Sequence, residues 1–340
     1  MFVVCGVSAV SFAQGFYLKV QGGYNFNGLQ SNESLTAPKV SGNTADLRSD
    51  GLVPMANINE LDSTYTPVKS SYGKGGNLSL GVGYMINKWF GVELGANYLW
   101  GGTTSSTVTT ILAPNNTIPA NPTTATAKIN THTNGLSLSP ALVFVAAIPK
   151  WPVEPYAKVG LALPVYGKVV HTVDVTLPEY NSVLYNNSYL GKENHMELET
   201  EGTVSLGVNW SIGVRYTPKQ LPFITVYAES NGQWLNVRGK STKITVYETS
   251  DGNGVMVDRI NNTDPSLNRP IYRTEFIYHD ALDGSSNNGE FNRYYKGYDP
   301  NKPKDDLRPI APFSNIGIQV GIQLNFSKEA LGSLKKKKAE

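Results

Sequence analysis

The sequence has little charge and no long apolar run. Only 16% of its 340 residues are charged, and the net charge is +2. This balance argues against a nucleic-acid partner, because proteins that bind nucleic acid concentrate positive charge. The aromatic content of 10% argues against a disordered chain. No segment reaches the about 18 consecutive apolar residues of a membrane helix, so a membrane-spanning part would have to be built from strands.

Cysteine is nearly absent. The single one, Cys5, lies in residues 1–14, MFVVCGVSAVSFAQ, which are typical of the apolar end of a secretory signal peptide. The tripeptide Ser11-Phe12-Ala13 matches the small-x-small cleavage rule. Cleavage there would remove all thiol and disulfide chemistry. At the other end, residues 327–340 contain four consecutive lysines and are expected to form a basic periplasmic tail.

Between these ends, apolar residues alternate with small or polar residues. In the first such segment Phe16, Leu18 and Val20 alternate with Tyr17 and Lys19. Because successive side chains of a strand point to opposite faces, this pattern predicts a strand with one apolar and one polar face. The segments are 15–27, 76–86, 90–100, 136–148, 156–165, 203–216, 223–229 and 315–326.

The connections between these segments are sorted by length. Short connections at 87–88, 149–153 and 217–222 alternate with long ones at about 28–75, 101–133, 170–202 and 240–313. Short periplasmic turns that alternate with long external loops are typical of bacterial barrels. Aromatic residues such as Phe16 and Tyr216 lie at the short-turn ends, and Tyr98 and Trp100 at the long-loop ends, as expected of two interfacial girdles. Residues 15–326 are therefore predicted to form an all-β, transmembrane, antiparallel up-and-down barrel of about eight strands.

The last segment ends in IGIQVGIQLNF, which closes on the aromatic residue Phe326. It resembles the C-terminal signal by which bacterial outer-membrane barrels are recognised for assembly. Over residues 15–326 the chain resembles the eight-stranded barrels typified by the OmpA transmembrane domain, OmpX and OmpW. In that family the closing Phe is commonly the last residue, whereas fourteen residues follow it here.

The resemblance implies the outer membrane of a Gram-negative bacterium as the location. It also implies contacts with outer-membrane lipid and lipopolysaccharide, and assembly by the barrel-assembly machinery with Phe326 as the signal. It implies no cofactor.

The polar faces of the segments carry five charged residues, Lys19, Glu93, Lys158, Arg215 and Glu229. The interior of an eight-stranded barrel is just wide enough to be filled by side chains. Unpaired charges are costly in such a space, so we expect an ion network that plugs the barrel. The alternative is a conducting or gated pathway.

No catalytic or metal-binding pattern stands out. The four histidines, His132, His171, His195 and His279, lie in or near the long connections without the spacing of a metal site or a catalytic pair, and are expected to be exposed. The segment from Asp251 to Asp258 lacks the spacing of a calcium-binding EF-hand loop. The sequence predicts neither an enzyme nor a bound metal.

The long connections offer two candidate surfaces. Residues 240–313 are rich in tyrosine, which favours recognition of an external partner, although these rings could instead pack among themselves. The tyrosines concerned are Tyr272, Tyr278, Tyr294, Tyr295 and Tyr298. The Thr- and Pro-rich segment 103–128 is expected to be an extended or flexible cover.

Two prolines, Pro140 and Pro164, lie nearly equidistant from the turn at 149–153 and should come close together on paired strands. Proline gives no ladder N–H, so the pair predicts a bulge or gap in the wall. One interpretation is that the hairpin frays where it leaves the membrane. The other is a lateral opening, which resembles the proline-flanked side openings of small barrels that exchange lipid-like molecules.

The leading functional hypothesis is a structural or surface-interaction barrel with the external loops as its binding surface. The alternative is a small transport barrel, porin-like or with a lateral gate, for small or hydrophobic solutes. The two differ in whether Glu93 and Lys158 block the lumen.

Overall fold

A computed structural model describes residues 15–28, 35–38, 52–112, 123–148, 151–176, 193–250, 254–294 and 296–326. The predicted signal peptide, the predicted basic tail and Tyr295 lie outside these residues. The described chain is almost entirely β-structure, with two short 3-10 helices, η2 (Pro265–Leu267) and η3 (Ile271–Arg273). Among the described residues no helix is long and apolar enough to cross a membrane.

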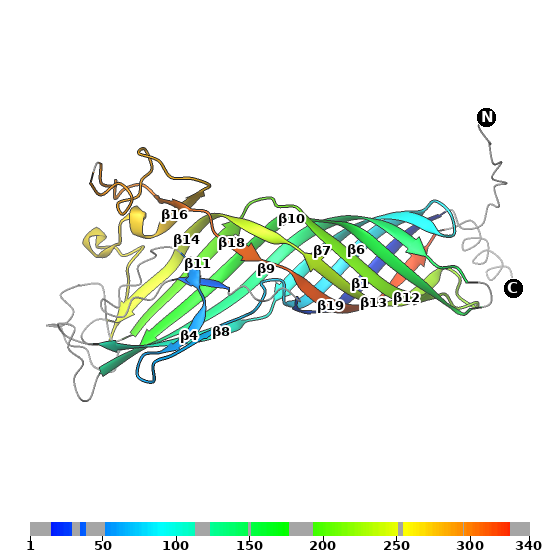
Figure 1. Ribbon diagram of the computed structural model, residues 1–340, viewed down its shortest axis with the longest axis horizontal. Helices are drawn as coiled ribbons and strands as arrows, with labels where there is room; N and C mark the ends of the chain where they lie inside the picture. The colour runs from blue at the N-terminus through cyan, green and yellow to red at the C-terminus, as the bar shows by residue number, and fades with distance from the viewer. Residues whose placement is uncertain are drawn as a thin grey trace.

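One set of strands pairs in a closed, antiparallel ring (Figure 1). Val20 of the first strand, for example, lies opposite Leu80 on one side and Ile322 on the other. Around the ring, the strands are β1 (Gly15–Asn27), β6 (Gly75–Met85), β7 (Phe90–Gly101), β9 (Thr123–Val145), β10 (Val153–Thr176), β12 (Gly207–Tyr216), β13 (Ile224–Trp234) and β19 (Asn315–Asn325). Each overlaps one of the segments with alternating polarity, so the predicted antiparallel β-structure is confirmed.

The expected number of about eight strands is too low for the sheet as a whole. The described residues form a 17-stranded sheet and a separate pair, β2 (Thr36–Pro38) and β3 (Leu52–Pro54), because the long connections contain strands of their own. These strands are β4 (Ala56–Asn59), β5 (Thr64–Pro67), β8 (Thr104–Leu112), β11 (Glu193–Gly202), β14 (Asn236–Ser250), β15 (Met256–Asp258), β16 (Glu275–His279), β17 (Lys304–Leu307) and β18 (Ile310–Pro312).

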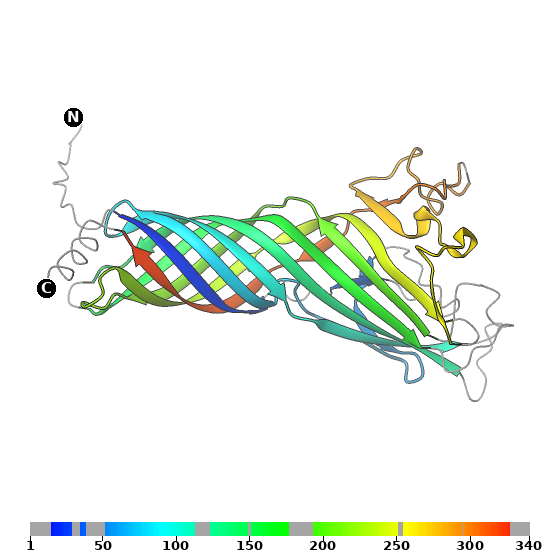
Figure 2. The same ribbon diagram turned by 180° about the vertical axis from the view of Figure 1, so that it is seen from behind.

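Beyond the ring, β9 and β10 continue into what we call the outer extension, formed by their far halves with β4, β5, β8, β11 and β14 (Figure 2). The strand β8 pairs with β9 along its whole length, from Thr104 opposite Thr131 to Leu112 opposite Thr123. Of the segment expected to be an extended or flexible cover, the described residues 104–112 and 123–128 are extended and lie in paired strands. The β-branched residues of this segment favour strands, which offsets the turn-forming character of the neighbouring prolines.

The ring is polar inside and apolar outside. On β1, Tyr17 is 3% exposed and faces inward, whereas its neighbour Phe16 is 62% exposed. The same alternation continues through Lys19 and Gln21, which are buried, and Leu18, which is exposed. An apolar band of this size on an outer surface marks a face that meets other apolar material rather than water.

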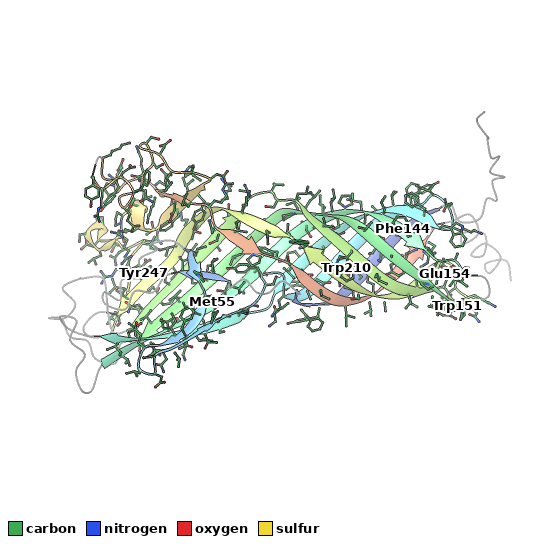
Figure 3. All side chains as sticks on the ribbon, viewed as in Figure 1. Met55, Phe144, Trp151, Glu154, Trp210 and Tyr247 are labelled. Atoms are coloured by element: carbon green, nitrogen blue, oxygen red, sulfur yellow. The ribbon has the colours of Figure 1, made fainter. Side chains whose placement is uncertain are left out.

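The outer extension has the opposite polarity, with an apolar core inside. Met55 and Tyr247 lie in this core at one end of the molecule, while Phe144 and Trp151 lie at the short-turn end (Figure 3). The buried apolar residues are Leu35, Met55, Tyr72, Val108, Ala127, Ile129, Val169, Val173, Val175, Met196, Leu198, Ile244 and Tyr247. An interior of this kind is stabilised by burial from water, as in a soluble β-structure.

Within β10, a β-bulge at Val165 marks the change of polarity. On the short-turn side of the bulge, below it, the odd-numbered residues Val159 and Leu161 are exposed. On the other side, above it, the odd-numbered residues Val169 and Val173 are buried. The pairing with β9 shifts by one residue between Pro164 and Tyr166, so the extra residue is Val165. A one-residue insertion turns every later side chain to the other face. The bulge thus lets one strand present apolar residues outward in the ring and inward in the extension.

The remaining connection, between β14 and β19, forms an outer lobe (residues 254–294 and 296–308). It stands to one side of the extension, beyond β14 (Figures 1 and 2). It is anchored to β14 by the antiparallel pairing of Thr242 with Phe276, and within the lobe β16 pairs in parallel with β17. The chain then returns to the ring through β18 and β19.

Candidate functional site

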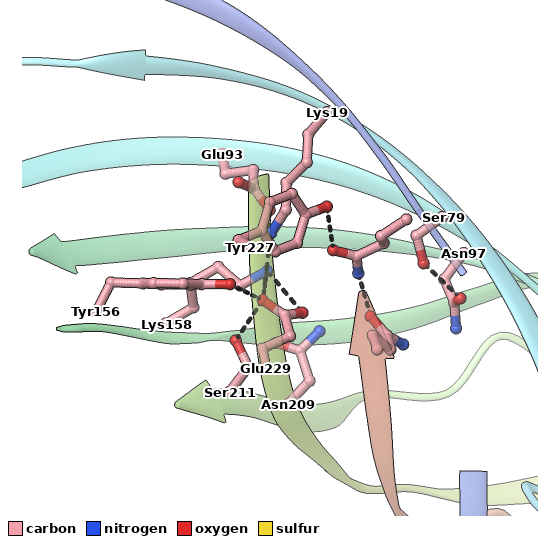
Figure 4. Close-up of polar contacts among 12 residues, drawn as sticks. Lys19, Ser79, Glu93, Asn97, Tyr156, Lys158, Asn209, Ser211, Tyr227 and Glu229 are labelled. Carbon is pink, nitrogen blue, oxygen red and sulfur yellow. Dashed lines mark hydrogen bonds and ion pairs between the residues drawn. The ribbon is translucent and has the colours of Figure 1, made fainter. Parts of the chain in front are cut away.

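Four charged side chains meet across the lumen of the ring. The Lys19 Nζ lies 3.2 Å from a Glu229 carboxylate oxygen. The Lys158 Nζ lies 3.2 Å from an oxygen of Glu93 and 3.2 Å from one of Glu229. The four side chains come from β1, β7, β10 and β13, so the network joins strands all around the ring (Figure 4). We call these residues the lumen network.

Tyrosine hydroxyls complete the hydrogen bonding of the two carboxylates. Tyr17 donates to Glu93 over 2.8 Å, and Tyr156 donates to Glu229. The ammonium group of Lys19 also lies 4.0 Å from the centre of the Tyr227 ring, a cation–π contact. Counting charges alone missed these three tyrosines. Their place on the polar, inward-facing positions of their strands was the signal that could have found them.

Neutral amides form the next layer toward the extension. Gln21 donates to Gln319, and Gln319 donates to Asn77 over 2.8 Å. Asn77 donates in turn to Asn25 over 2.8 Å, while the Tyr227 hydroxyl donates to Gln21 over 2.9 Å. Buried amides that bond to one another satisfy donors and acceptors without any net charge. Side chains therefore cross the lumen in at least two successive layers, beside a hollow lined by Lys19, Glu93, Lys158 and Glu229.

The structure does not bring Arg215 into the lumen network. Its Nε lies 2.8 Å from Glu154, a partly exposed residue near the start of β10. Arg215 is the penultimate residue of β12, close to the short turn, so it reaches its partner at the rim. Four of the five charged residues expected in one network are thus found together.

The two prolines lie on neighbouring strands near irregular pairing. Pro140 is opposite Leu94 of β7, and Pro164 is opposite Ser137 of β9. Between β9 and β10, the ladder runs from Gly160 opposite Ala141 to Leu163 opposite Leu138 without pairing the residues between them. Pro140 falls in this interruption, and Pro164 directly precedes the bulge.

The tyrosines of the outer lobe divide into two groups. Tyr272 and Tyr278 are buried. The ring of Tyr272 stacks on Tyr298 at 4.0 Å, and burial raises the pKa of Tyr278 to about 12 despite its hydrogen bond with Thr242. Tyr294 is 77% exposed, and Tyr298 is 48% exposed. The buried pair stabilises the lobe, while the other two are accessible to a partner.

The histidines lie in strands rather than in loops. His171 is completely buried in the extension, with its Nδ1 2.9 Å from the Thr131 hydroxyl. Burial, with a smaller effect of His132, lowers the pKa of His171 to about 3. The expectation of exposed histidines is wrong for this residue, because Val169, His171 and Val173 share the inward face. In the described part of the chain, no group of three His, Cys, Asp or Glu residues could hold a metal ion.

The end of the last strand is joined to the beginning of the first. The backbone N–H of Phe326 donates to the carbonyl of Phe16 over 2.9 Å, and both side chains are exposed on the outer, apolar side. The residue expected to act in assembly therefore lies at the seam where the ring closes. Its role in assembly stays a prediction.

A closed ring with a polar interior and an apolar exterior defines a β-barrel protein. The family model of the outer membrane protein beta-barrel domain matches residues 2–246, so the chain belongs to this family. The predicted resemblance and the predicted location in the bacterial outer membrane are thereby confirmed. The crystal structure of a major outer membrane protein from Thermus thermophilus is similar over 92% of this chain and 99% of that chain, at 11% identity and a TM-score of 0.30. No curated protein matches the chain.

Proposed function

We propose that the ring spans the outer membrane as an eight-stranded up-and-down barrel with a closed lumen, and that the protein has a structural or surface-interaction role. The observation that carries this proposal is the lumen network. It links four strands across the interior at one level, through Lys19, Glu93, Lys158 and Glu229. The apolar outer face of the ring would contact outer-membrane lipid and lipopolysaccharide.

A solute on its way through the lumen would have to separate these pairs. The Glu229 side chain is 1% exposed and contacts both lysines, so parting them would leave it without a counter-charge. Separating buried charges leaves each of them unpaired in a space of low dielectric, which costs several kcal/mol. A transport barrel, porin-like or gated, would instead require a hydrated lumen at this level. The lumen network therefore favours a closed barrel over a transport role.

The outer lobe would provide the binding surface. Its exposed aromatic residues, Phe291, Tyr294 and Tyr298, lie among charged groups of both signs such as Arg293. Aromatic rings in a polar setting provide contact area at low conformational cost, which favours a protein or glycan partner outside the cell. The proposal includes no catalytic step. The segment that ends at Phe326 would be the contact for the barrel-assembly machinery.

Planar-bilayer conductance of the refolded protein tests the closed lumen. We expect the wild type to show no steady conductance, and a Lys158→Ala/Glu229→Ala variant to conduct, because it removes the central pair while keeping the net charge. A Glu154→Ala/Arg215→Ala variant is the matched control, since it removes an ion pair outside the network and should stay silent. A wild type with a stable open channel would overturn the proposal in favour of transport.

A further inference from the structure

The wall of the ring has a gap on one side of β10. The ladder of β10 with β12 ends at Ala162 opposite Gly207, and the ladder of β10 with β11 starts at Lys168 opposite Glu201. Both ladders share one register, so residues 163–167 and 202–206 face each other. All of these residues are described, and no ladder pair joins them. At about 3.3 Å per residue, the unpaired stretch is roughly 16 Å long.

The gap has a structural cause, because both of its edges change face at this level. Inward positions are even-numbered in β10 below the bulge and odd-numbered above it. In the facing chain they are even-numbered in β11, as at Met196 and Leu198, and odd-numbered in β12, as at Ser211. Between β11 and β12, where the inward face changes, the segment forms a hydrogen bond with β14: the Thr203 N–H donates to the Arg238 carbonyl over 2.7 Å. Pro164 on the opposite edge has no N–H to leave unpaired.

The rim of the gap is apolar and exposed. Val204 is 79% exposed, and Val165, Tyr166 and Leu206 are also exposed. The gap lies at the bulge, where the outward face of the wall changes from apolar to polar. On the proposed orientation this level is the outer surface of the bilayer, so the rim faces the outer leaflet.

Behind the gap lies a chamber that is open to solvent. Its walls include the apolar side chains of Leu99, Leu235, Val237 and Phe313. The charged residues of its lining, Lys168 and Glu201, are both engaged in ion pairs, with Glu199 and Lys240 respectively. A chamber lined in this way suits a small molecule with an apolar chain.

One polar group in the chamber wall lacks a partner. Asn315 is 5% exposed, and its Nδ2 donates to the Phe313 carbonyl over 3.2 Å. Its Oδ1 is buried and has no hydrogen-bond partner among the described residues. A buried carbonyl oxygen without a donor costs about 1 to 3 kcal/mol. The lining therefore calls for an uncharged molecule with a hydrogen-bond donor in its head group.

We propose that this chamber binds an uncharged amphipathic molecule, whose head group donates to the Asn315 amide oxygen and whose apolar chain lies along Leu235 and Phe313. It enters from the outer leaflet through the gap between β10 and residues 202–206. The inference rests on the proposed membrane orientation. Because the lumen network lies below the chamber, the molecule leaves by the way it came and does not cross the membrane.

The test compares three probes with the same chain, using the full protein in lipid nanodiscs. Monooleoylglycerol has an uncharged head with donors, methyl oleate has no donor, and oleate is charged. We expect saturable binding of monooleoylglycerol that is at least tenfold tighter than that of the other two. Equal binding of methyl oleate or oleate would overturn the role of Asn315, and no saturable binding of any probe would overturn the site.

Variants locate the bound molecule. Leu235→Trp fills the chamber and should weaken monooleoylglycerol binding at least tenfold, whereas Val226→Trp makes a similar change on the lipid-facing side and should leave it unchanged. If Leu235→Trp does not fold, methyl shifts in the wild type give the answer: Leu99 and Val237 should move with the probe and Val226 should not. Equal effects at both places would overturn the chamber as the site. Conductance without the probe tests the closed lumen separately, so the two proposals can fail independently.

Discussion

Gly83 lies opposite Tyr17 in the β1–β6 ladder, and the Tyr17 ring covers the space that a side chain at position 83 would occupy. A Cβ atom on Gly83 would overlap that ring. The same arrangement recurs at Gly321, which lies opposite Tyr227. Glycines at these two positions let large rings lie flat inside a narrow lumen and direct their hydroxyls to their partners.

Gly83→Ala should therefore displace Tyr17 and break its hydrogen bond to Glu93. We expect a loss of about 1 to 3 kcal/mol in the free energy of unfolding, from overpacking and from the lost donor. Urea unfolding of the refolded protein in lipid vesicles measures it. Gly81→Ala is the control, because a Cβ atom there meets its nearest neighbour, the Cβ of Lys19, at an ordinary 3.5 Å. Equal losses in the two variants would contradict the role of ring packing.

Removing one carboxylate from the lumen network should destabilise the barrel more than removing one at the rim. Glu229→Ala leaves Lys19 and Lys158 short of a counter-charge in a buried place, at a cost of at least about 1 to 3 kcal/mol. Glu154→Ala removes the partner of Arg215, which is partly exposed, and should cost less than about 1 kcal/mol. Glu93→Ala should resemble Glu229→Ala. Equal stability of all three variants and the wild type would indicate a hydrated lumen.

The ring could be predicted from the sequence because its signal is local. Alternation such as Leu18, Val20 and the buried Lys19 between them reveals a strand and its two faces without knowledge of the partner strand. The predicted segment 203–216 shows where the local signal misleads, because the strand β12 begins only at Gly207. Val204 and Leu206 continue the alternation, but they belong to the gap.

The outer extension could not be predicted in the same way. Its strands alternate too, as at Val169, His171 and Val173, but apolar residues there face inward and the phase reverses at Val165. Pro140 and Pro164 indicated a bulge or gap but not that the faces reverse there. The pairing of β8 with β9 depends on contacts that alternation does not encode. The lumen charges were predicted to meet because a narrow lumen leaves them no other place. Arg215 is the exception, because it lies at the rim and pairs with Glu154 there.

The buried His171 should make the extension sensitive to acid. Its pKa is lowered to about 3, mainly by burial, whereas in the unfolded chain it is near 6.5. Below pH 6.5 His171 binds a proton in the unfolded chain but not in the folded chain. The free energy of unfolding therefore falls as the pH drops toward 3. At pH 5 the loss should be about 2 kcal/mol.

Amide protection factors of residues 168–176, each relative to the intrinsic exchange rate at that pH, measure this effect between pH 7 and pH 4. His171→Leu should remove most of the pH dependence, because no group is left at position 171 to take up the proton. His195→Gln is the control, since that histidine is partly exposed and lies 2.7 Å from Asp174. If the protection factors in His171→Leu fall with acid as much as in the wild type, another group governs the acid response.

The two kinds of tyrosine in the outer lobe should separate stability from binding. Tyr272→Ala removes a buried ring that stacks on Tyr298 and a hydroxyl that accepts the Gly289 N–H over 2.8 Å. We expect it to unfold the lobe, seen as rapid proteolysis within residues 254–308 while the ring stays resistant. Tyr294→Ala removes an exposed ring and should leave proteolysis unchanged, but it should weaken adhesion of whole cells to a surface ligand if the lobe is the binding surface. Wild-type adhesion with Tyr294→Ala and Tyr298→Ala combined would place the binding surface elsewhere on the extension.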